Sequence, residues 1–153
     1  MNLLNIECPV TAALNGPAWR NCEIPLLSDI VLASKTAQFQ DSTHSISGML
    51  PGDGMHIVMP LLLRMNRGRY FLLTGQTLST EQAKALGLVN EVLPQAQVLE
   101  RAWKHARLLA QKLTLLLRYK RLMFTEHLRK RMHNLLGYGL AIEGLALMEQ
   151  PES

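Results

Sequence analysis

No proline occurs between Pro94 and Pro151, so the last part of the sequence lacks the residue that most often ends a helix. Apolar residues recur there at intervals of three or four, which places them on one face of an amphipathic helix. The region is too long for a single helix in a small domain, so we expect breaks near 112–116 and at Thr125 or Gly137. The apolar positions are Val98, Ala102, Ala106, Leu109, Leu113, Leu117, Met123 or Phe124, Leu128 and Leu135.

Residues 1–94 have a different pattern, in which short apolar runs are closed by glycine, proline or polar residues. The run at 9–14 ends in Asn15-Gly16-Pro17 and predicts a buried strand. The longer run at 24–33 predicts a second strand, apolar enough to be covered on both faces of a sheet. Two further strands are expected at 36–39 and 88–93.

Helices are expected between these strands. Helical spacing begins at Gly54 and continues to Asn66, and a second short helix is expected from Arg69 to Thr74. Ser79-Thr80-Glu81-Gln82 has the pattern of a capping box at the start of a third helix, which Gly87 would end. We therefore predict one α/β domain, with its core in residues 1–94 and a helical region in residues 95–153.

Composition excludes several classes of function. The net charge of +4 arises mostly between Arg101 and Arg131, in segments expected to be helices with solvated faces. Aromatic residues make up only 5% of the chain, so we do not expect nucleic-acid binding, and no apolar run is long enough to span a membrane. Cys8 and Cys22 have neither metal-ligand spacing nor the density of a disulfide framework. We therefore expect a cytoplasmic protein with no metal and no cofactor.

The densest group of chemically active side chains lies between Phe39 and His56. His44 precedes Asp53 by nine residues, and the turn-forming Ser47-Gly48-Met49-Leu50-Pro51-Gly52 between them allows the chain to fold back. A carboxylate beside an imidazole fixes its tautomer and stabilises its charged form, so a His-Asp pair could activate water near neutral pH. Asp41 and His56 are competing partners that spacing alone does not exclude.

Four blocks of sequence, quoted at the end of this paragraph, resemble the crotonase (enoyl-CoA hydratase/isomerase) superfamily, and the resemblance covers roughly residues 9–149. It implies a spiral of ββα turns followed by C-terminal helices, usually assembled into a trimer or a dimer of trimers that acts on a small molecule. It also implies that the beginning of the spiral, before Pro9, is missing, so we expect a fragment or truncated gene product. The blocks begin with Pro9-Val10-Thr11-Ala12-Ala13-Leu14-Asn15-Gly16-Pro17, Ser28-Asp29-Ile30-Val31-Leu32-Ala33, Gly48-Met49-Leu50-Pro51-Gly52-Asp53-Gly54, and Leu73-Thr74-Gly75-Gln76-Thr77-Leu78-Ser79.

Two departures from the hydratase pattern bear on the reaction. Hydratases follow the Asn-Gly turn with a glycine-rich run whose backbone amide forms half of an oxyanion hole, whereas this chain has Trp19-Arg20-Asn21-Cys22 there. Hydratases also use two glutamates. Glu23 matches the first glutamate, but the position of the second holds His44.

The histidine, the Pro-Gly-Asp-Gly turn and the segment from Asn66 to Gly75 are similar to a smaller branch, the β-diketone hydrolases of the 6-oxocamphor hydrolase type. That resemblance implies that His44 is the base, that Asp53 orients it, and that Glu143 on the last helix completes the catalytic residues. It leaves Asp41 and His56 as bystanders.

Three neighbouring residues are candidates for substrate binding. Asn21 stands where the branch would place a carbonyl-binding histidine, and Trp19 and Glu23 flank it. The expected reaction is a retro-Claisen cleavage, in which activated water breaks a carbon-carbon bond of a β-diketone. The alternatives are an enoyl-CoA hydratase or isomerase that depends on Glu23, and an inactive truncated crotonase-like protein.

Overall fold

The protein was studied as a computed structural model that describes residues 2–149. Its central feature is a parallel three-stranded sheet in the order β1-β2-β5, formed by Thr11–Leu14, Ile30–Ser34 and Glu91–Leu93. Thr11 lies opposite Ile30, and Leu32 opposite Glu91. A second, antiparallel pair joins β3 (Gln38–Phe39) to β4 (Leu78–Ser79). This mixture of helices and parallel strands confirms the predicted α/β class.

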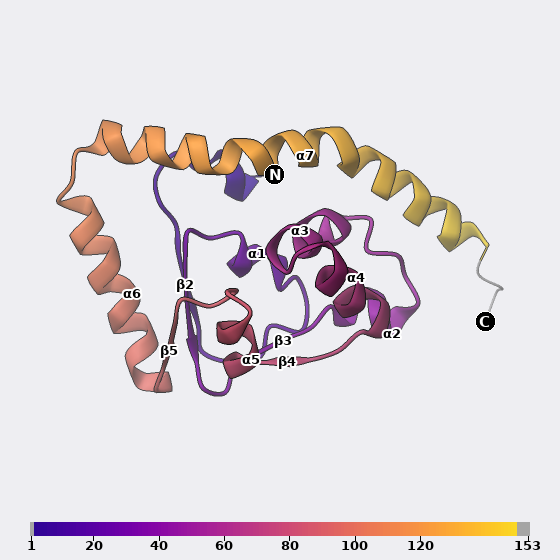
Figure 1. The fold of residues 1–153 in the computed structure, drawn as a ribbon, viewed down its shortest axis with the longest axis horizontal. Helices are drawn as coiled ribbons and strands as arrows, with labels where there is room; N and C mark the ends of the chain where they lie inside the picture. The colour runs from indigo at the N-terminus through magenta and orange to yellow at the C-terminus, as the bar shows by residue number, and fades with distance from the viewer. Residues whose placement is uncertain (1, 150–153) are drawn as a thin grey trace.

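Helices occupy the connections between the strands, except the short turn between β2 and β3, and they make up the C-terminal region (Figure 1). A 3-10 helix at Asn2–Asn5 precedes β1. None of the helices within residues 2–149 combines the length and the apolar character needed to cross a membrane. The α-helices are α1 (Glu23–Leu26), α2 (Ser42–Ser47), α3 (Met55–Leu62), α4 (Met65–Thr74), α5 (Thr80–Ala85), α6 (Gln95–Ala110) and α7 (Thr114–Met148).

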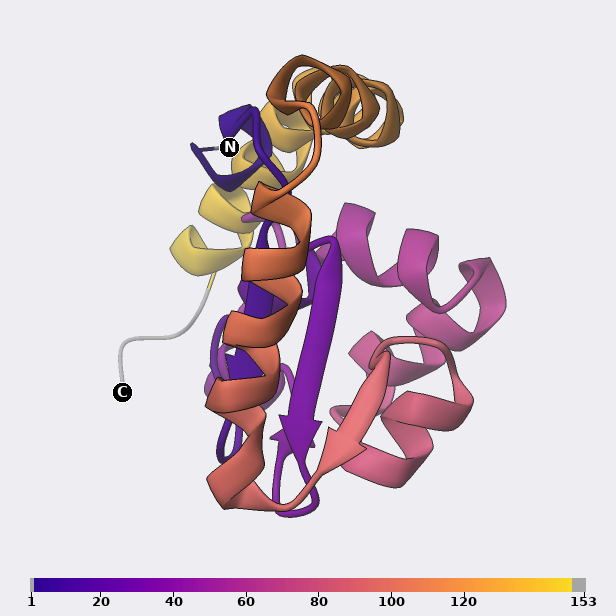
Figure 2. The same cartoon turned by 90° about the vertical axis from the view of Figure 1, so that its left-hand side faces the viewer.

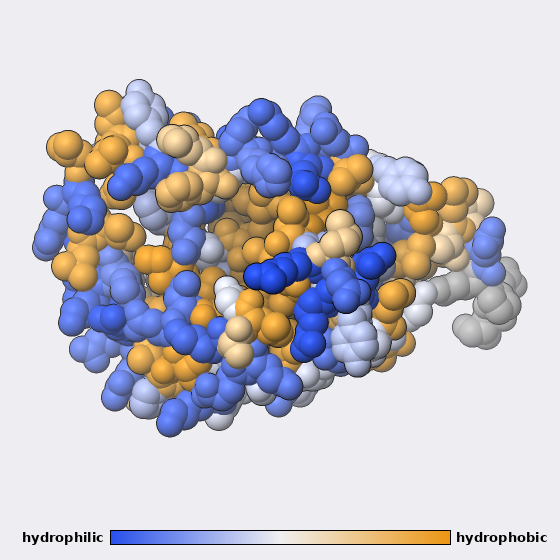
Figure 3. Space-filling model, in the orientation of Figure 1, coloured by the Kyte–Doolittle hydropathy of each residue, from blue (hydrophilic) through white to orange (hydrophobic). Residues whose placement is uncertain are grey.

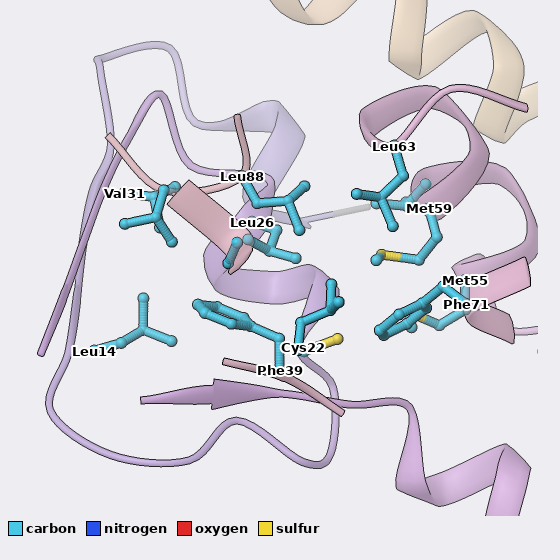
Figure 4. Close-up of a cluster of buried hydrophobic side chains, with 14 of the residues drawn as sticks. Leu14, Cys22, Leu26, Val31, Phe39, Met55, Met59, Leu63, Phe71 and Leu88 are labelled. Atoms are coloured by element: carbon cyan, nitrogen blue, oxygen red, sulfur yellow. The ribbon is translucent and has the colours of Figure 1, made fainter. Parts of the chain in front are cut away.

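Both faces of the sheet are covered by apolar side chains. Helix α6 runs along one face, where Val98 and Ala102 pack against Leu32 (Figure 2). The main core lies on the other side, between β3, α1, α3 and α4, with Phe39 and Phe71 fully buried at its centre (Figure 4). This core fixes the segments that carry the candidate site.

Two polar clusters attach the C-terminal helices to the rest of the chain. Glu91 on β5 accepts hydrogen bonds from Arg101 and His105 of α6, and the Arg101 contact holds the pKa of the Glu91 carboxyl down to about 2. Arg121 of α7 is 2% exposed; it pairs with Asp29 at 2.5 Å and also donates to the carbonyl of Leu3 at 3.1 Å. Helix α7 is thereby tied both to the N-terminal segment and to the turn before β2.

Several local predictions are confirmed. Strands occur within the runs at 9–14, 36–39 and 88–93. Helices α3 and α4 overlap the helices predicted from Gly54 to Asn66 and from Arg69 to Thr74. Ser79 accepts a hydrogen bond from the Gln82 amide, and the Gln82 side chain accepts one from Ser79, which completes the capping box. Gly87 follows the end of α5 with φ of +81°, a conformation that favours glycine.

Two predictions about the elements are wrong. The run at 24–33 is not one strand, because its first part is helix α1 and only Ile30–Ser34 pairs with β1 and β5. Pro25 cannot donate to a strand ladder but fits the first turn of a helix. In the C-terminal region the break expected near 112–116 is present between Ala110 and Thr114, but the second expected break is absent, because α7 continues past Thr125 and Gly137.

Candidate active site

The candidate site is centred on His44, which is 5% exposed and lies on α2. Its Nδ1 is 2.7 Å from Oδ1 of Asp41, a residue whose side chain is 4% exposed. Asp41 occupies the position before the helix, but its carboxylate bonds to the imidazole instead of capping a backbone amide. Its other oxygen, Oδ2, is buried and has no hydrogen-bond partner within residues 2–149.

Asp53 lies on the opposite side of the same ring. Its Oδ1 is 3.7 Å from His44 Nε2, within ion-pair range but beyond a direct hydrogen bond. Asp53 is 40% exposed, and its Oδ1 also accepts a hydrogen bond from the Met55 amide at 3.3 Å. The turn at 48–54 therefore does bring Asp53 to His44.

The expectation that Asp41 is a bystander is wrong, because it makes the shorter contact with His44. The sequence signal for the contact between Asp41 and His44 was their i, i+3 spacing. This spacing brings the two side chains together only because residues 42–47 form a helix. A carboxylate at Nδ1 can only accept, so the neutral ring carries its proton there and has a lone pair on Nε2. Because Nε2 and Asp53 Oδ1 are 3.7 Å apart, a water bonded to both would lie beside the line that joins them and not between them.

Glu143 lies on α7 at 9% exposure, facing the turn that carries Asp53. A Cβ atom on Gly52 would lie only 2.7 Å from Glu143 Oε2. The structure thus places this third predicted catalytic residue beside the backbone immediately before Asp53. Its role in catalysis remains a prediction.

Glu23, at the start of α1, belongs to the same electrostatic cluster. Burial raises the pKa of its carboxyl; the negative charges of Asp53 and Asp41 add to the rise, and His44 opposes it. Its Oε2 is buried and lacks a hydrogen-bond partner in the described part of the chain. Burial, with help from Glu23 and Asp41, also raises the pKa of the neighbouring Cys22 thiol to about 12, so this cysteine is not a nucleophile at neutral pH.

Trp19 and Asn21 are less closely connected to His44. The Trp19 indole donates to Gln38 at 3.0 Å, and its ring lines a hollow of about 610 Å³ to which His44, Asp53 and Glu143 do not contribute. Asn21 is exposed and has φ of +52°, in the left-handed region that asparagine adopts more readily than most residues other than glycine. Substrate binding by these two residues remains a prediction.

An apolar pocket of about 190 Å³ adjoins the site between the Asp53 turn and α7. The pocket is lined by Leu50, Pro51, Gly52, His56, Tyr138, Gly139 and Ile142.

Among residues 2–149, no group of three or more histidine, cysteine, aspartate or glutamate side chains is arranged to hold a metal ion.

Comparison with known proteins identifies the class. The family model described as enoyl-CoA hydratase/isomerase matches residues 1–150, and this chain belongs to that family. A short-chain enoyl-CoA hydratase of Clostridioides difficile is 32% identical over 117 residues, which are 76% of this chain and 75% of that protein. The mitochondrial enoyl-CoA hydratase of Pongo abelii is 33% identical over 110 residues, 71% of this chain but only 38% of that protein.

Among solved structures, a β-diketone hydrolase of the cyanobacterium Anabaena sp. PCC 7120, bound to (S)-3-oxocyclohexyl acetic acid, is 50% identical with a TM-score of 0.91. The match covers 94% of this chain and 57% of the hydrolase. An enoyl-CoA hydratase of Mycobacterium paratuberculosis is 29% identical with a TM-score of 0.81, over 90% of this chain and 62% of that one. The predicted crotonase fold and superfamily are therefore confirmed, and this chain spans little more than half of the solved β-diketone hydrolase.

Proposed function

We propose that this chain carries the catalytic centre of a hydrolase that cleaves a carbon-carbon bond of a β-diketone. The observation that carries the proposal is the buried imidazole of His44 between two carboxylates, with Asp41 at Nδ1 and Asp53 facing Nε2. Its 50% identity to a β-diketone hydrolase supports the same reaction class. The two carboxylates beside this ring belong to aspartates, not to the pair of glutamates that hydratases use.

The proposed reaction uses one water molecule. His44 Nε2 takes a proton from the water while its oxygen attacks one carbonyl carbon, which gives a tetrahedral oxyanion. When the oxyanion collapses, the bond to the central carbon breaks, and its electron pair passes into the second carbonyl as an enolate. The imidazolium then gives its proton to the central carbon of the enolate. The products are a carboxylic acid and a ketone, joined in one molecule if the diketone is cyclic.

The two aspartates have separate roles in this scheme. Asp41 accepts from Nδ1–H, which keeps the Nε2 lone pair available and stabilises the imidazolium that forms. Asp53, at 3.7 Å from Nε2 and partly exposed, helps to hold the attacking water. This differs from the expectation that Asp53 orients the ring, because the ring is fixed by the hydrogen bond that it donates to Asp41.

The surroundings of the ring also suit a neutral, partly apolar substrate. The pocket beside Gly52 offers an apolar wall for the hydrocarbon part of a diketone, and Glu143 faces the same turn. We propose that Glu143 accepts a hydrogen bond from the attacking water and so helps to orient it. Trp19 and Asn21 remain candidates for further substrate contacts.

The purified chain should hydrolyse a cyclic 1,3-diketone, and His44→Ala should reduce kcat by roughly 10²–10⁴-fold, because general-base catalysis is worth about that much. His133→Ala is the matched control, since that histidine is exposed on α7. Unchanged turnover in His44→Ala would reject the assignment. If the unaltered chain hydrolyses no diketone and converts no enoyl-CoA thioester, an inactive crotonase-like protein is favoured instead.

A second candidate is an enoyl-CoA hydratase or isomerase. The observation in its favour is Glu23, whose partly buried carboxyl with a raised pKa is suited to proton transfer. The 32% identity to an enoyl-CoA hydratase supports the same alternative. Calorimetry with an enoyl-CoA thioester separates the two functions: binding that disappears in Glu23→Ala favours the hydratase, whereas no heat of binding argues against it.

We also propose that the chain assembles with copies of itself, as a trimer or a dimer of trimers, and works in the cytoplasm. Large apolar side chains remain exposed along α7, and hydrophobic surface gathers over both ends of this helix (Figure 3). Both cysteines are free, which fits a reducing compartment.

A further inference from the structure

Helix α7 touches the turn before Asp53 at two glycines whose backbones are in contact. A Cβ atom on Gly52 would lie 2.4 Å from the Gly139 carbonyl oxygen, and one on Gly139 would lie 2.6 Å from the Gly52 oxygen. Both residues are buried, and neither is among the glycines with positive φ. Glycine is therefore needed here for space and not for backbone conformation.

His56 occupies the remaining space above Gly139. A Cβ atom on Gly139 would lie 2.2 Å from His56 Cε1 and 2.8 Å from Nε2, so the edge of the ring rests on the bare helix backbone. On the other side of the ring, Nδ1 donates to the Pro51 carbonyl at 2.8 Å, and the His56 amide donates to the same oxygen at 3.1 Å. These two bonds close the loop 51–56, which carries Asp53.

Glu143 stands one helical turn beyond Gly139 and therefore on the same face of α7. The contact of Gly139 with His56 and Gly52 thus fixes how closely Glu143 approaches the Asp53 turn. A shift of the helix by the size of one methyl group would move Glu143 relative to both Asp53 and the ring of His44. None of these three side chains would be lost, but their mutual geometry would change.

We propose that His56 is a positioning residue: it closes the Asp53 turn through Pro51 and, by resting on Gly139, sets the distance between that turn and Glu143. His56 does not touch the reacting atoms in this scheme. The effect on catalysis rests on the proposed function, whereas the contact itself does not.

The first test is Gly139→Ala, with Gly137→Ala and Gly144→Ala as matched controls on the same helix. A Cβ atom at either control position meets no atom within 4 Å, so these variants should keep full activity. In Gly139→Ala, kcat should fall by about 10²-fold, the scale of loss expected when catalytic groups are displaced by about 1 Å, with a much smaller change in KM. Activity equal to that of the two controls would overturn the proposal.

A second variant separates positioning from simple loss of folding. His56→Asn keeps an amide N–H near the position of Nδ1, so the bond to Pro51 can persist, but it removes the ring edge that collides with a methyl group at 139. The double variant Gly139→Ala/His56→Asn should therefore recover part of the lost kcat, about tenfold, while the methyl group at 139 still meets the Gly52 oxygen and keeps the rest of the loss. A double variant no better than Gly139→Ala would contradict the proposal.

A third measurement does not depend on diketone turnover. In protein labelled with ¹⁵N in histidine, NMR should show His56 protonated on Nδ1, and Gly139→Ala should shift both its ring signals and those of His44. The two control variants should leave these signals in place. If the unaltered chain cleaves no diketone, the proposed function is wrong, but the positioning contact is still tested. That contact is refuted if the His56 ring signals of Gly139→Ala are the same as those of the unaltered chain.

Discussion

At the scale of single residues, His44 lies between two carboxylates in different environments. Asp41 is almost fully buried and bonds directly to Nδ1, whereas Asp53 is 40% exposed and faces Nε2 across 3.7 Å. A buried acceptor decides which ring nitrogen carries the proton, while a partly exposed carboxylate can bind and exchange water. Removing their charges should therefore have unequal effects.

We predict that Asp41→Asn lowers kcat more than Asp53→Asn does. An amide at position 41 can donate to Nδ1 and so permit the wrong tautomer, which should reduce kcat by roughly 10²–10⁴-fold, the full worth of the base. Asp53→Asn weakens only a hydrogen bond to water, a loss of roughly 1.5 kcal/mol, or about tenfold. Steady-state kinetics on a 1,3-diketone measures both, and the reverse ranking would assign the orienting role to Asp53.

Glu23 gives a prediction about stability. Its pKa is raised in the folded protein, so folding favours the protonated form, and ionisation of Glu23 costs stability once the pH rises above the carboxyl's ordinary value. Glu23→Gln should raise the Tm at pH 7, and the gain should vanish near pH 3, where the wild-type carboxyl is protonated in both states. Thermal unfolding across this pH range checks the sign. An equal gain at both pH values would mean that packing and not charge is responsible.

The sequence could identify His44, Asp53 and Glu143 as candidates, and the structure brings all three to one region. It could not rank Asp41 above Asp53, because the bond between Asp41 and His44 depends on the short helix α2. That helix falls in a stretch rich in serine and glycine, which local pattern predicts as turns. The packing of Gly52 against Gly139, 87 positions later in the chain, leaves no local signal at all.

At the scale of elements, the best-predicted features are those determined by neighbouring residues. The capping box at Ser79 and the glycine after α5 are local patterns, and both are confirmed. Helix α1 was missed because its apolar residues resemble those of the strand that follows. The continuity of α7 was missed because Thr125 bonds to the Arg121 carbonyl at 2.9 Å within the helix and Gly137 is simply tolerated there.

The attachment of α7 through Arg121 can be tested directly. Arg121→Ala removes the partner of Asp29 and leaves the carbonyls of Leu3 and Ile6 without this donor, so unfolding should become easier by roughly 3–5 kcal/mol. Arg118→Ala is the control, because its pair with Glu7 is exposed and should be worth only about 0–1 kcal/mol. Urea unfolding of the two variants compares them, and equal losses would show that burial of Arg121 contributes nothing.

At the scale of the whole molecule, α7 leaves much apolar surface uncovered. Met123 and Phe124 are 73% and 70% exposed, and Met148 at the end of the helix is 82% exposed. Isolated exposed apolar residues are ordinary, but this concentration along one helix is typical of a surface that another protein copy covers.

We therefore predict that light scattering gives a mass that is a multiple of 17.2 kDa, at or near three copies. Phe124→Glu should lower that mass by placing a charge in the interface, whereas Lys130→Glu, at an exposed polar position on the same helix, should not. A monomeric mass for the unaltered chain would contradict the proposed assembly.

The order of strands in the sheet also decides when the protein can fold as it leaves the ribosome. The central strand β2 has a neighbour early in the chain, β1, but its other neighbour is β5, and Val31 bonds to Asn90 across 59 positions. Everything from β3 to α5 must therefore be synthesised before β2 can be paired on both edges. During that interval one edge of β2 is open to incorrect pairing, so slow synthesis between residues 40 and 90 should make the nascent chain more dependent on chaperones.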